Sequence, residues 1–190
     1  SSSRGLGDVY KRQESWRSSF FNQKDINKNS SLFAFSSARA GNVIGGGDWS
    51  KNRIIPDIIN ALYEGKEIIV RNPLSTRPWQ HVIEPLSGYL RLAEKLYSNK
   101  SKYSTPYNFG PFINSNKTVK ELVEESLKEW SGDFIITSNN SVPHEAKMLY
   151  LIVDKAFKEL DWEPYWDFAN TVKKTIISVS YTHLRAHETT

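Results

Sequence analysis

The stretch Ser37–Trp49 reads SARAGNVIGGGDW and places three consecutive glycines after a short apolar segment. Apolar and small residues from 32 to 44, closed by glycines, predict a buried β-strand followed by a turn. Glycine accepts positive φ angles and allows a ligand close to the backbone, so the turn is a candidate phosphate loop. The spacing differs from Gly-x-Gly-x-x-Gly, which in the dinucleotide fingerprint follows the first strand of a βαβ unit and is answered by an acidic residue about 20 positions later. If this loop contacts a phosphate, we therefore expect it to act as a substrate loop and not as the cofactor turn.

The next segment, 53–66, has the pattern of an amphipathic helix. Four isoleucine and leucine residues recur at i, i+3, i+4 and i+7 between Ile55 and Leu62. Pro56 suits the first turn of a helix, and Gly65 suits its C-terminal exit. A short strand is expected to follow at 67–73.

A second helix is expected at 84–97, with Pro85 near its start. Its buried stripe is predicted to consist of Leu86, Tyr89, Leu90, Ala93, Leu96 and Tyr97. Thr118 and Glu121 have the spacing of a capping box and predict the start of a third helix. Strands are expected at 105–111 and 133–138, and two more helices near the end of the chain. Strands interleaved with helices indicate an α/β fold.

The two ends of the chain differ from the rest. Residues 1–13, SSSRGLGDVYKRQ, and residues 179–190, VSYTHLRAHETT, show no amphipathic period and resemble translated adapter sequence. We therefore expect both ends to be non-native and the range 14–178 to be one domain or a large part of one. The ends account for half of the formal net charge of +4. The remaining basic residues are scattered among acids, so a nucleic-acid partner is not expected.

The composition excludes several classes of protein. The chain has no cysteine, which excludes disulfides, thiolate nucleophiles and cysteine zinc sites. No apolar run approaches the roughly 20 residues that span a bilayer, and no signal peptide is recognisable. A cytoplasmic protein without a membrane partner is expected. His183 and His187 stand four apart beside Glu188, but they lie in the discounted tail, so no metal site is expected.

Five motifs carry a resemblance: ARAGNVIGGGDW, RIIPDII, RPWQHVIEPLSGYL, YNFGP and PHEAKMLYL. Together they resemble the C-terminal part of the extended short-chain dehydrogenase/reductase superfamily, over about Glu14 to Ile177. GGGDW and RPWQHV are similar to its CDP-sugar branch. The resemblance implies the C-terminal strands of a partial Rossmann-like NAD(P)-binding fold, together with the small substrate-binding α/β region. It also implies that the glycine turn forms a wall of the cleft where a nucleotide sugar meets the nicotinamide.

The resemblance also implies roles for individual residues. Asn42 would hydrogen-bond the sugar diphosphate, Arg53 and Ile54 would lie against the nucleotide, Arg77 would clamp the diphosphate and Asn108 would support that contact. The arginine role has an independent physical argument, because a guanidinium offers two parallel charge-assisted hydrogen bonds to a pyrophosphate. The alternative for Arg77 is a surface residue stacked on a neighbouring tryptophan. Asn42 has the alternative of tying down its loop, and Asn108 that of bonding its own backbone.

Four further residues are candidates with weaker support. Arg39 is a candidate cofactor contact, with the alternative that it only tethers the loop. His81 and His144 with Glu145 fall in stretches that the superfamily places near the substrate. A lone histidine is, however, more often a packed or capping residue.

The resemblance implies NAD-dependent loss of water from CDP-glucose. Such chemistry uses a Tyr-x-x-x-Lys pair and a carboxylic acid/base pair. From Glu14 onward the sequence contains no Tyr-x-x-x-Lys, and Tyr10 has no lysine four residues on. We therefore assign no catalytic residue and expect a fragment that keeps the substrate-binding half, is inactive alone and comes from a homo-oligomeric protein. A sibling epimerase or decarboxylase and a non-catalytic nucleotide-binding module remain as alternatives.

Overall fold

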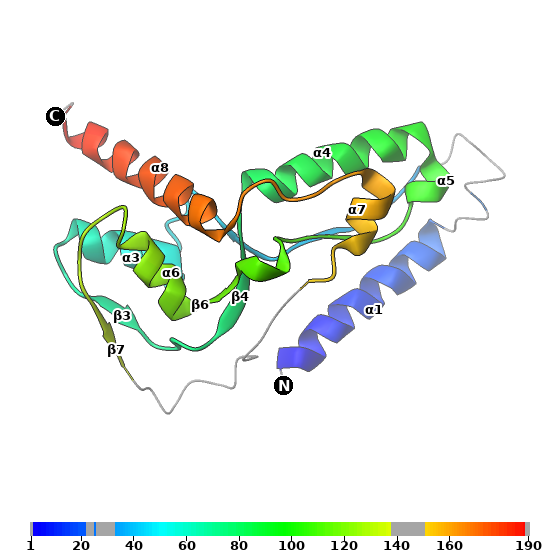
Figure 1. Cartoon of the computed structure of the whole chain (residues 1–190). Coiled ribbons are helices and arrows are strands. Elements are labelled where there is room, and N and C mark those ends of the chain that lie inside the picture. The colour runs from blue at the N-terminus through cyan, green and yellow to red at the C-terminus, as the bar shows by residue number, and fades with distance from the viewer. Residues whose placement is uncertain (1, 22–24, 26–32, 138–150, 189–190) are drawn as a thin grey trace.

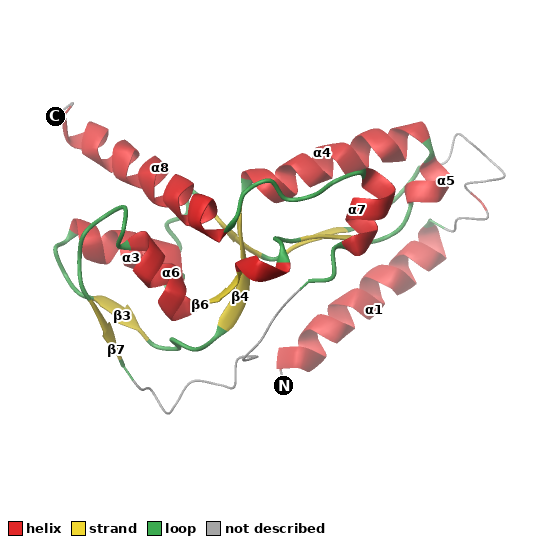
Figure 2. Cartoon of the chain, viewed as in Figure 1, coloured by secondary structure: helices red, strands yellow, loops and turns green. Residues whose placement is uncertain are grey.

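The computed structural model of the chain describes residues 2–21, 25, 33–137 and 151–188. It is an α/β structure in which short strands, most of them parallel, are covered by helices (Figures 1 and 2). The strands form three small sheets: β1 (Ala38–Ala40) with β5 (Tyr107–Phe109), β4 (Thr76–His81) between β2 (Asn42–Ile44) and β6 (Asn116–Thr118), and β3 (Ile68–Val70) with β7 (Phe134–Ile136). Among the strands of the described ranges, only the β4–β6 pair is antiparallel. The α/β prediction is confirmed.

The expected single strand over 32–44 is wrong in detail. The segment forms two strands, β1 and β2, which are separated by Gly41 and join different sheets. A Cβ atom at Gly41 would lie 2.9 Å from the carbonyl oxygen of Pro78. The chain thus passes β4 so closely at this point that only glycine fits, and there it changes from one sheet to the next.

The helix predicted at 53–66 is confirmed as α3 (Ile54–Tyr63). Its buried residues include all four members of the i, i+3, i+4, i+7 pattern, from Ile55 to Leu62. Gly65 has a φ of +64°, in keeping with its predicted place at the exit of the helix. This helix packs into a core with α6 (Val119–Ser126) and α8 (Phe168–Glu188).

The capping box predicted for α6 is confirmed. The Thr118 hydroxyl accepts a hydrogen bond from the Glu121 backbone N–H at 3.1 Å, and the Glu121 carboxylate accepts one from the Thr118 N–H at 2.7 Å.

The helix predicted at 84–97 is present as α4 (Ile83–Ser98), but its predicted buried stripe is wrong. The buried positions are Glu84, Pro85, Gly88 and Leu92, whereas Leu90 is 74% exposed and Tyr97 90% exposed. Of the predicted stripe, only Tyr89 and Leu96 pack against the core.

The reason for the rotated face is a close approach of α4 to β5. A Cβ atom on Gly88 would lie 2.2 Å from Cδ1 of Phe109, which is fully buried. The helix therefore contacts the strand through its smallest residue, and this fixes which face is inward.

The described residues form two cores. One lies among α3, β3, β4, α6 and α8, and the other among α4, β5 and α7 (Asp154–Leu160). Figure 1 shows them at opposite ends of the molecule, with α3, α6, β3 and β7 on the left and α4, α5 (Lys100–Tyr103) and α7 on the right. A single 3₁₀ turn, Ile113–Ser115, precedes β6.

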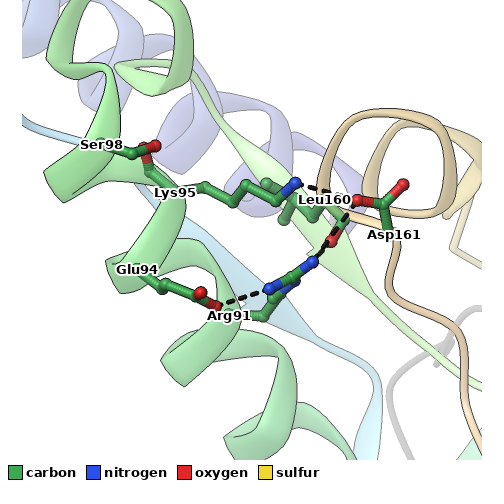
Figure 3. Close-up of polar contacts among 6 residues, drawn as sticks. All are labelled: Arg91, Glu94, Lys95, Ser98, Leu160 and Asp161. Atoms are coloured by element: carbon green, nitrogen blue, oxygen red, sulfur yellow. Dashed lines mark hydrogen bonds and ion pairs between the residues drawn. The ribbon is translucent and has the colours of Figure 1, made fainter.

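Surface charges join α4 to the end of α7 (Figure 3). Arg91 donates from Nε to the carbonyl of Leu160 at 2.9 Å and from Nη1 to Glu94 at 2.6 Å. Lys95 and Arg91 both reach the carboxylate of Asp161, at 2.9 and 3.4 Å. Asp161 ends the helix with a φ of +53°, so this α4–α7 junction holds the chain where α7 stops.

Helices cross both predicted boundaries of the native segment. The first helix, α1, runs over Ser2–Phe20, and α8 runs to Glu188. Val179, just beyond the boundary at 178, belongs to the core and is 4% exposed. The non-native origin of 1–13 and 179–190 stays a prediction. Within the described ranges, no helix has the length and apolar character needed to cross a membrane.

Candidate functional site

A cleft with a volume of about 1020 Å³ lies at the carboxyl end of β2. Its walls come from β2 and the glycine loop after it, the start of α3, the segment joining β3 to β4, and the first residues of β4 and α6. The apolar part of the lining includes Ile54, Ile69, Trp79, Val82 and Val119. A cleft with one apolar side and a few charged groups is the usual form of a small-molecule site.

The glycine loop is a wall of this cleft, but its glycines are explained by packing. A Cβ atom at Gly45 would lie 2.8 Å from Cγ1 of Val82, and one at Gly46 would lie 2.8 Å from the Ser178 hydroxyl. Gly47 has a φ of +84°, which side chains rarely adopt. The three glycines therefore allow β2 to turn sharply against α4 and α8.

Arg77 is the buried cation of the cleft. It is the second residue of β4, lines the cleft and is only 8% exposed. Its Nη1 donates to the carbonyl of Thr76 at 2.9 Å. The alternative of an exposed surface arginine is wrong. Two residues further on, Trp79 is 3% exposed and donates from its indole N–H to the Lys117 carbonyl at 2.9 Å, which fixes this part of the strand.

Arg53 lies at the mouth of the cleft. It is the N-cap residue of α3, and its Nη1 pairs with the Asp48 carboxylate at 2.9 Å. The Arg53 side chain is 66% exposed. Hydrogen bonds from the Ser50 backbone N–H and from Arg53 hold the pKa of Asp48 below its ordinary value. This pair therefore stays charged and ties the glycine loop to the start of α3.

The structure brings four of the predicted substrate residues to this one cleft: Asn42, Arg53, Ile54 and Arg77. They come from β2, the start of α3 and β4. Their contacts with a ligand stay predictions.

Other predicted residues lie away from the cleft lining. His81 is 6% exposed at the end of β4; its Nδ1 accepts from the Ile83 N–H at 3.3 Å and its ring contacts Trp166 edge-on. Burial lowers the pKa of His81, which therefore packs as a neutral side chain. Asn108 donates to the Ile152 carbonyl at 3.2 Å.

Arg39, the predicted cofactor contact, pairs in register with Asn108 across β1 and β5. It donates from Nε to Oε1 of Gln13 at 3.2 Å. His144 and Glu145 lie outside the described residues. The roles of all these residues toward a ligand remain predictions.

Sequence reasoning missed a third arginine in the cleft. Arg71 follows β3, lines the cleft and donates from Nη2 to the Asn52 side-chain oxygen at 3.4 Å. Burial raises the pKa of Asp57, and the positive charge of Arg71 acts in the opposite direction and lowers it. The only local signal for Arg71 was its place in the short strand expected at 67–73, which is too common to indicate a site.

The charges of the lining favour an anion. Three guanidinium groups and two carboxylates, those of Asp48 and Asp57, line the cleft. The three cations exceed the two carboxylates even when both Asp48 and Asp57 are charged. A concave site with excess positive charge concentrates anions such as phosphates.

Comparison with known proteins gives the cleft a context. No family model matches the chain. Over 178 residues, which make up 93% of the chain, it is 40% identical to the CDP-glucose 4,6-dehydratase of Salmonella typhimurium. The chain is homologous to part of that dehydratase. It spans 48% of the enzyme's length.

Solved structures show the same fold at lower identity. One is the NAD complex of dTDP-glucose 4,6-dehydratase from Bacillus anthracis, with a TM-score of 0.63 and 23% sequence identity. The match covers 78% of the present chain and 45% of the dehydratase chain. Another is UDP-glucose 4-epimerase from Bifidobacterium longum in complex with NAD+ and UDP, with a TM-score of 0.65 and 16% sequence identity. This match covers 84% of the present chain and 51% of the epimerase chain. The chain therefore shares the fold of these dehydratase and epimerase structures, and the predicted partial Rossmann-like fold is confirmed.

The described residues do not fit the diphosphate of a dinucleotide. No Gly-x-Gly-x-x-Gly turn leads into a helix in the described ranges. The space beside Gly45 and Gly46, where a phosphate would approach the backbone, is occupied by the side chains of Val82 and Ser178. The buried Oδ1 of Asn108, which pairs in register with Arg39, lacks a hydrogen-bond partner among the described residues. The same ranges contain no group of three or more His, Asp or Glu side chains able to hold a metal ion.

Proposed function

We propose that the cleft binds the nucleoside diphosphate of a nucleotide sugar, and that the protein is a dehydratase acting on CDP-glucose. The 40% identity to CDP-glucose 4,6-dehydratase supports the choice of this substrate. The observation that carries the proposal is the position of Arg77, buried in the same cleft as Asn42, Arg53 and Ile54.

The chemistry of the lining suits such a ligand. A buried guanidinium offers two parallel N–H groups to phosphate oxygens, and the interaction strengthens where water is excluded. Asn42 adds an amide donor from the first position of β2, and Arg53 adds a second cation at the mouth of the cleft. The apolar wall formed by Ile54, Trp79 and Val119 suits a ribose or a base.

The reaction itself belongs to the proposal. NAD is named in the B. anthracis dehydratase structure, and we carry it over as the cofactor, with Arg39 as its contact in this chain. Because the described residues supply no dinucleotide diphosphate site, we derive no step through the nicotinamide. We further propose that the 190-residue chain binds CDP-glucose but is inactive on it alone, since the sequence has no Tyr-x-x-x-Lys. The whole protein is proposed to be a cytoplasmic homo-oligomer without nucleic-acid or membrane partners.

A ligand-induced shift of the unfolding temperature tests the binding step. CDP-glucose and CDP are expected to stabilise the chain, and AMP at the same concentration is expected to have little effect. Arg77→Met should abolish the shift. Lys128→Met, at an exposed pair with Glu125, is the matched control and should keep it. A folded chain that CDP-glucose does not stabilise at millimolar concentration would refute the proposal.

A further inference from the structure

Arg71 differs from the other two arginines of the cleft in its surroundings. Arg53 is paired with Asp48, and Arg77 is buried inside β4. Arg71 is exposed and forms no ion pair within the described part of the chain; its hydrogen bond there is the one to Asn52 at 3.4 Å. Most of its five N–H donors therefore face the cleft or water.

The neighbour of Arg71 on the cleft side is apolar. Ile69 is the middle residue of β3, and Arg71 is the first residue after this strand. Ile69 is 56% exposed and lines the cleft with Arg71. An apolar side chain beside a planar guanidinium suits the face and edge of an aromatic ring, and a highly charged phosphate gains nothing from the isoleucine.

The loop opposite keeps the guanidinium in place. Asn52 has a φ of +64°, a conformation that asparagine tolerates better than most residues, and its backbone N–H is bonded to the Asp57 carboxylate. Its side-chain oxygen is thereby held toward Arg71. Strained backbone of this kind is concentrated at ligand sites.

We propose that Arg71 reads the base of the nucleotide and selects cytosine over uracil and thymine. This inference rests on the proposed function. Cytosine presents two adjacent acceptors, O2 and N3, which match two parallel N–H groups of a guanidinium. Uracil and thymine carry a hydrogen on N3, so the same fork would meet a donor there and leave a polar group unpaired. Sites built on hydrogen bonds reject analogues that lack the matching group.

The test is titration of the full 190-residue chain with CDP, UDP, dTDP and inorganic pyrophosphate, followed by calorimetry. The unaltered chain should bind CDP about tenfold or more tightly than UDP and dTDP. Arg71→Met should weaken the binding of CDP about tenfold and change the affinities for UDP and dTDP by no more than about twofold. The variant should therefore lose the preference for CDP. Arg71→Lys keeps the charge but not the fork and should also lose the preference.

Lys66→Met is the control, because Lys66 is a cation on the other side of β3 in the sequence and lies outside the cleft lining. It should leave all four affinities unchanged. If Arg71→Met weakens CDP, UDP, dTDP and pyrophosphate equally, Arg71 is a phosphate contact and the base-reading proposal falls while nucleotide binding stands. If the preference for CDP survives in both Arg71 variants, the proposal also falls. If the folded, unaltered chain binds no nucleotide, the proposed function fails and this inference fails with it.

Discussion

Arginine serves two different purposes at the two ends of this molecule. At the α4–α7 junction, Arg91 directs Nε to Leu160, Nη1 to Glu94 and Nη2 to Asp161 (Figure 3). In the cleft, Arg71 bonds a single amide oxygen, and Arg77 is buried beside an apolar wall. In the first arrangement, all three nitrogen atoms of the guanidinium are hydrogen-bonded to other residues of the fold. The second places both guanidinium groups in the lining of a cleft that a ligand can fill.

The difference shows that residue type alone does not identify a binding arginine. Arg91 and Arg71 each directly follow an apolar residue, Leu90 and Val70, and this local sequence gives no reason to separate them. What separates them is the number of carboxylate and carbonyl oxygens within reach. Changes in the cleft should therefore alter binding, and changes at the junction should alter stability.

The largest expected effect is on binding. Arg77→Ala should weaken CDP about a hundredfold or more, because removing a charged partner from a water-poor site costs several kcal/mol. Titration calorimetry measures it, with the unfolding temperature recorded in parallel. Arg91→Ala is the matched change at the junction and should leave CDP affinity unchanged. Equal losses from the two variants would erase the contrast between the regions.

The next effect is on the second core. Gly88→Ala should lower the free energy of unfolding by about 1–3 kcal/mol, because the new methyl group would overlap the ring of Phe109. The helix-forming advantage of alanine, about 1 kcal/mol, is smaller than this overlap cost. Urea unfolding followed by circular dichroism gives the value. Leu90→Ala, at an exposed position of the same helix, should change it by no more than about 0.5 kcal/mol.

A smaller effect is expected at the start of α6, beside the cleft. Thr118→Ala removes the hydroxyl that caps the helix and should cost about 1 kcal/mol of unfolding free energy. Thr118→Ser keeps the hydroxyl and should restore most of it. The same unfolding measurements apply, and a Thr118→Ser variant as unstable as Thr118→Ala would show that the cap contributes nothing.

Glu121 makes this cap dependent on pH. The hydrogen bond from the Thr118 backbone N–H lowers the pKa of Glu121 below its ordinary value of 4.5. Its contribution to stability is therefore complete above pH 4.5 and is lost as the pH falls from there through the lowered pKa. Measured from pH 3 to 7, the free energy of unfolding should fall more steeply toward acid pH for the unaltered chain than for Glu121→Gln. Parallel curves would contradict the assignment.

The smallest effect is expected at the junction surface. Arg91→Ala should destabilise the chain slightly, and the difference should shrink at high salt because these charges are exposed. Unfolding at low and at molar sodium chloride measures it. An effect that is independent of salt would indicate that the bond from Nε to Leu160, and not the ion pairs, carries the contribution.

Sequence reasoning succeeded where the signal is local. The i, i+3, i+4, i+7 pattern in α3 and the Thr118–Glu121 capping box depend on residues within a few positions of each other, and both are present. The stripe on α4 failed because its apolar residues cover more than one face. The contact of Gly88 with Phe109, some 20 positions away, decided which face is buried.

The candidate site divides in the same way. Residue motifs pointed to Asn42, Arg53, Ile54 and Arg77, and the structure places these in one cleft. His81 was grouped with them by its motif, but it packs against Trp166. Arg71 was not predicted as a site residue, because a single arginine at the end of a short strand carries no distinguishing pattern.

The sequence by itself determined the α/β class, the main helices and the presence of a glycine turn after a strand. Those features follow from side-chain size, capping and backbone freedom within one turn or strand. Only the tertiary structure decided that Gly45 and Gly46 serve packing and that Arg71 joins Arg77 in one cleft. Such outcomes depend on contacts between segments far apart in the chain, where volume and charge must match at the same place.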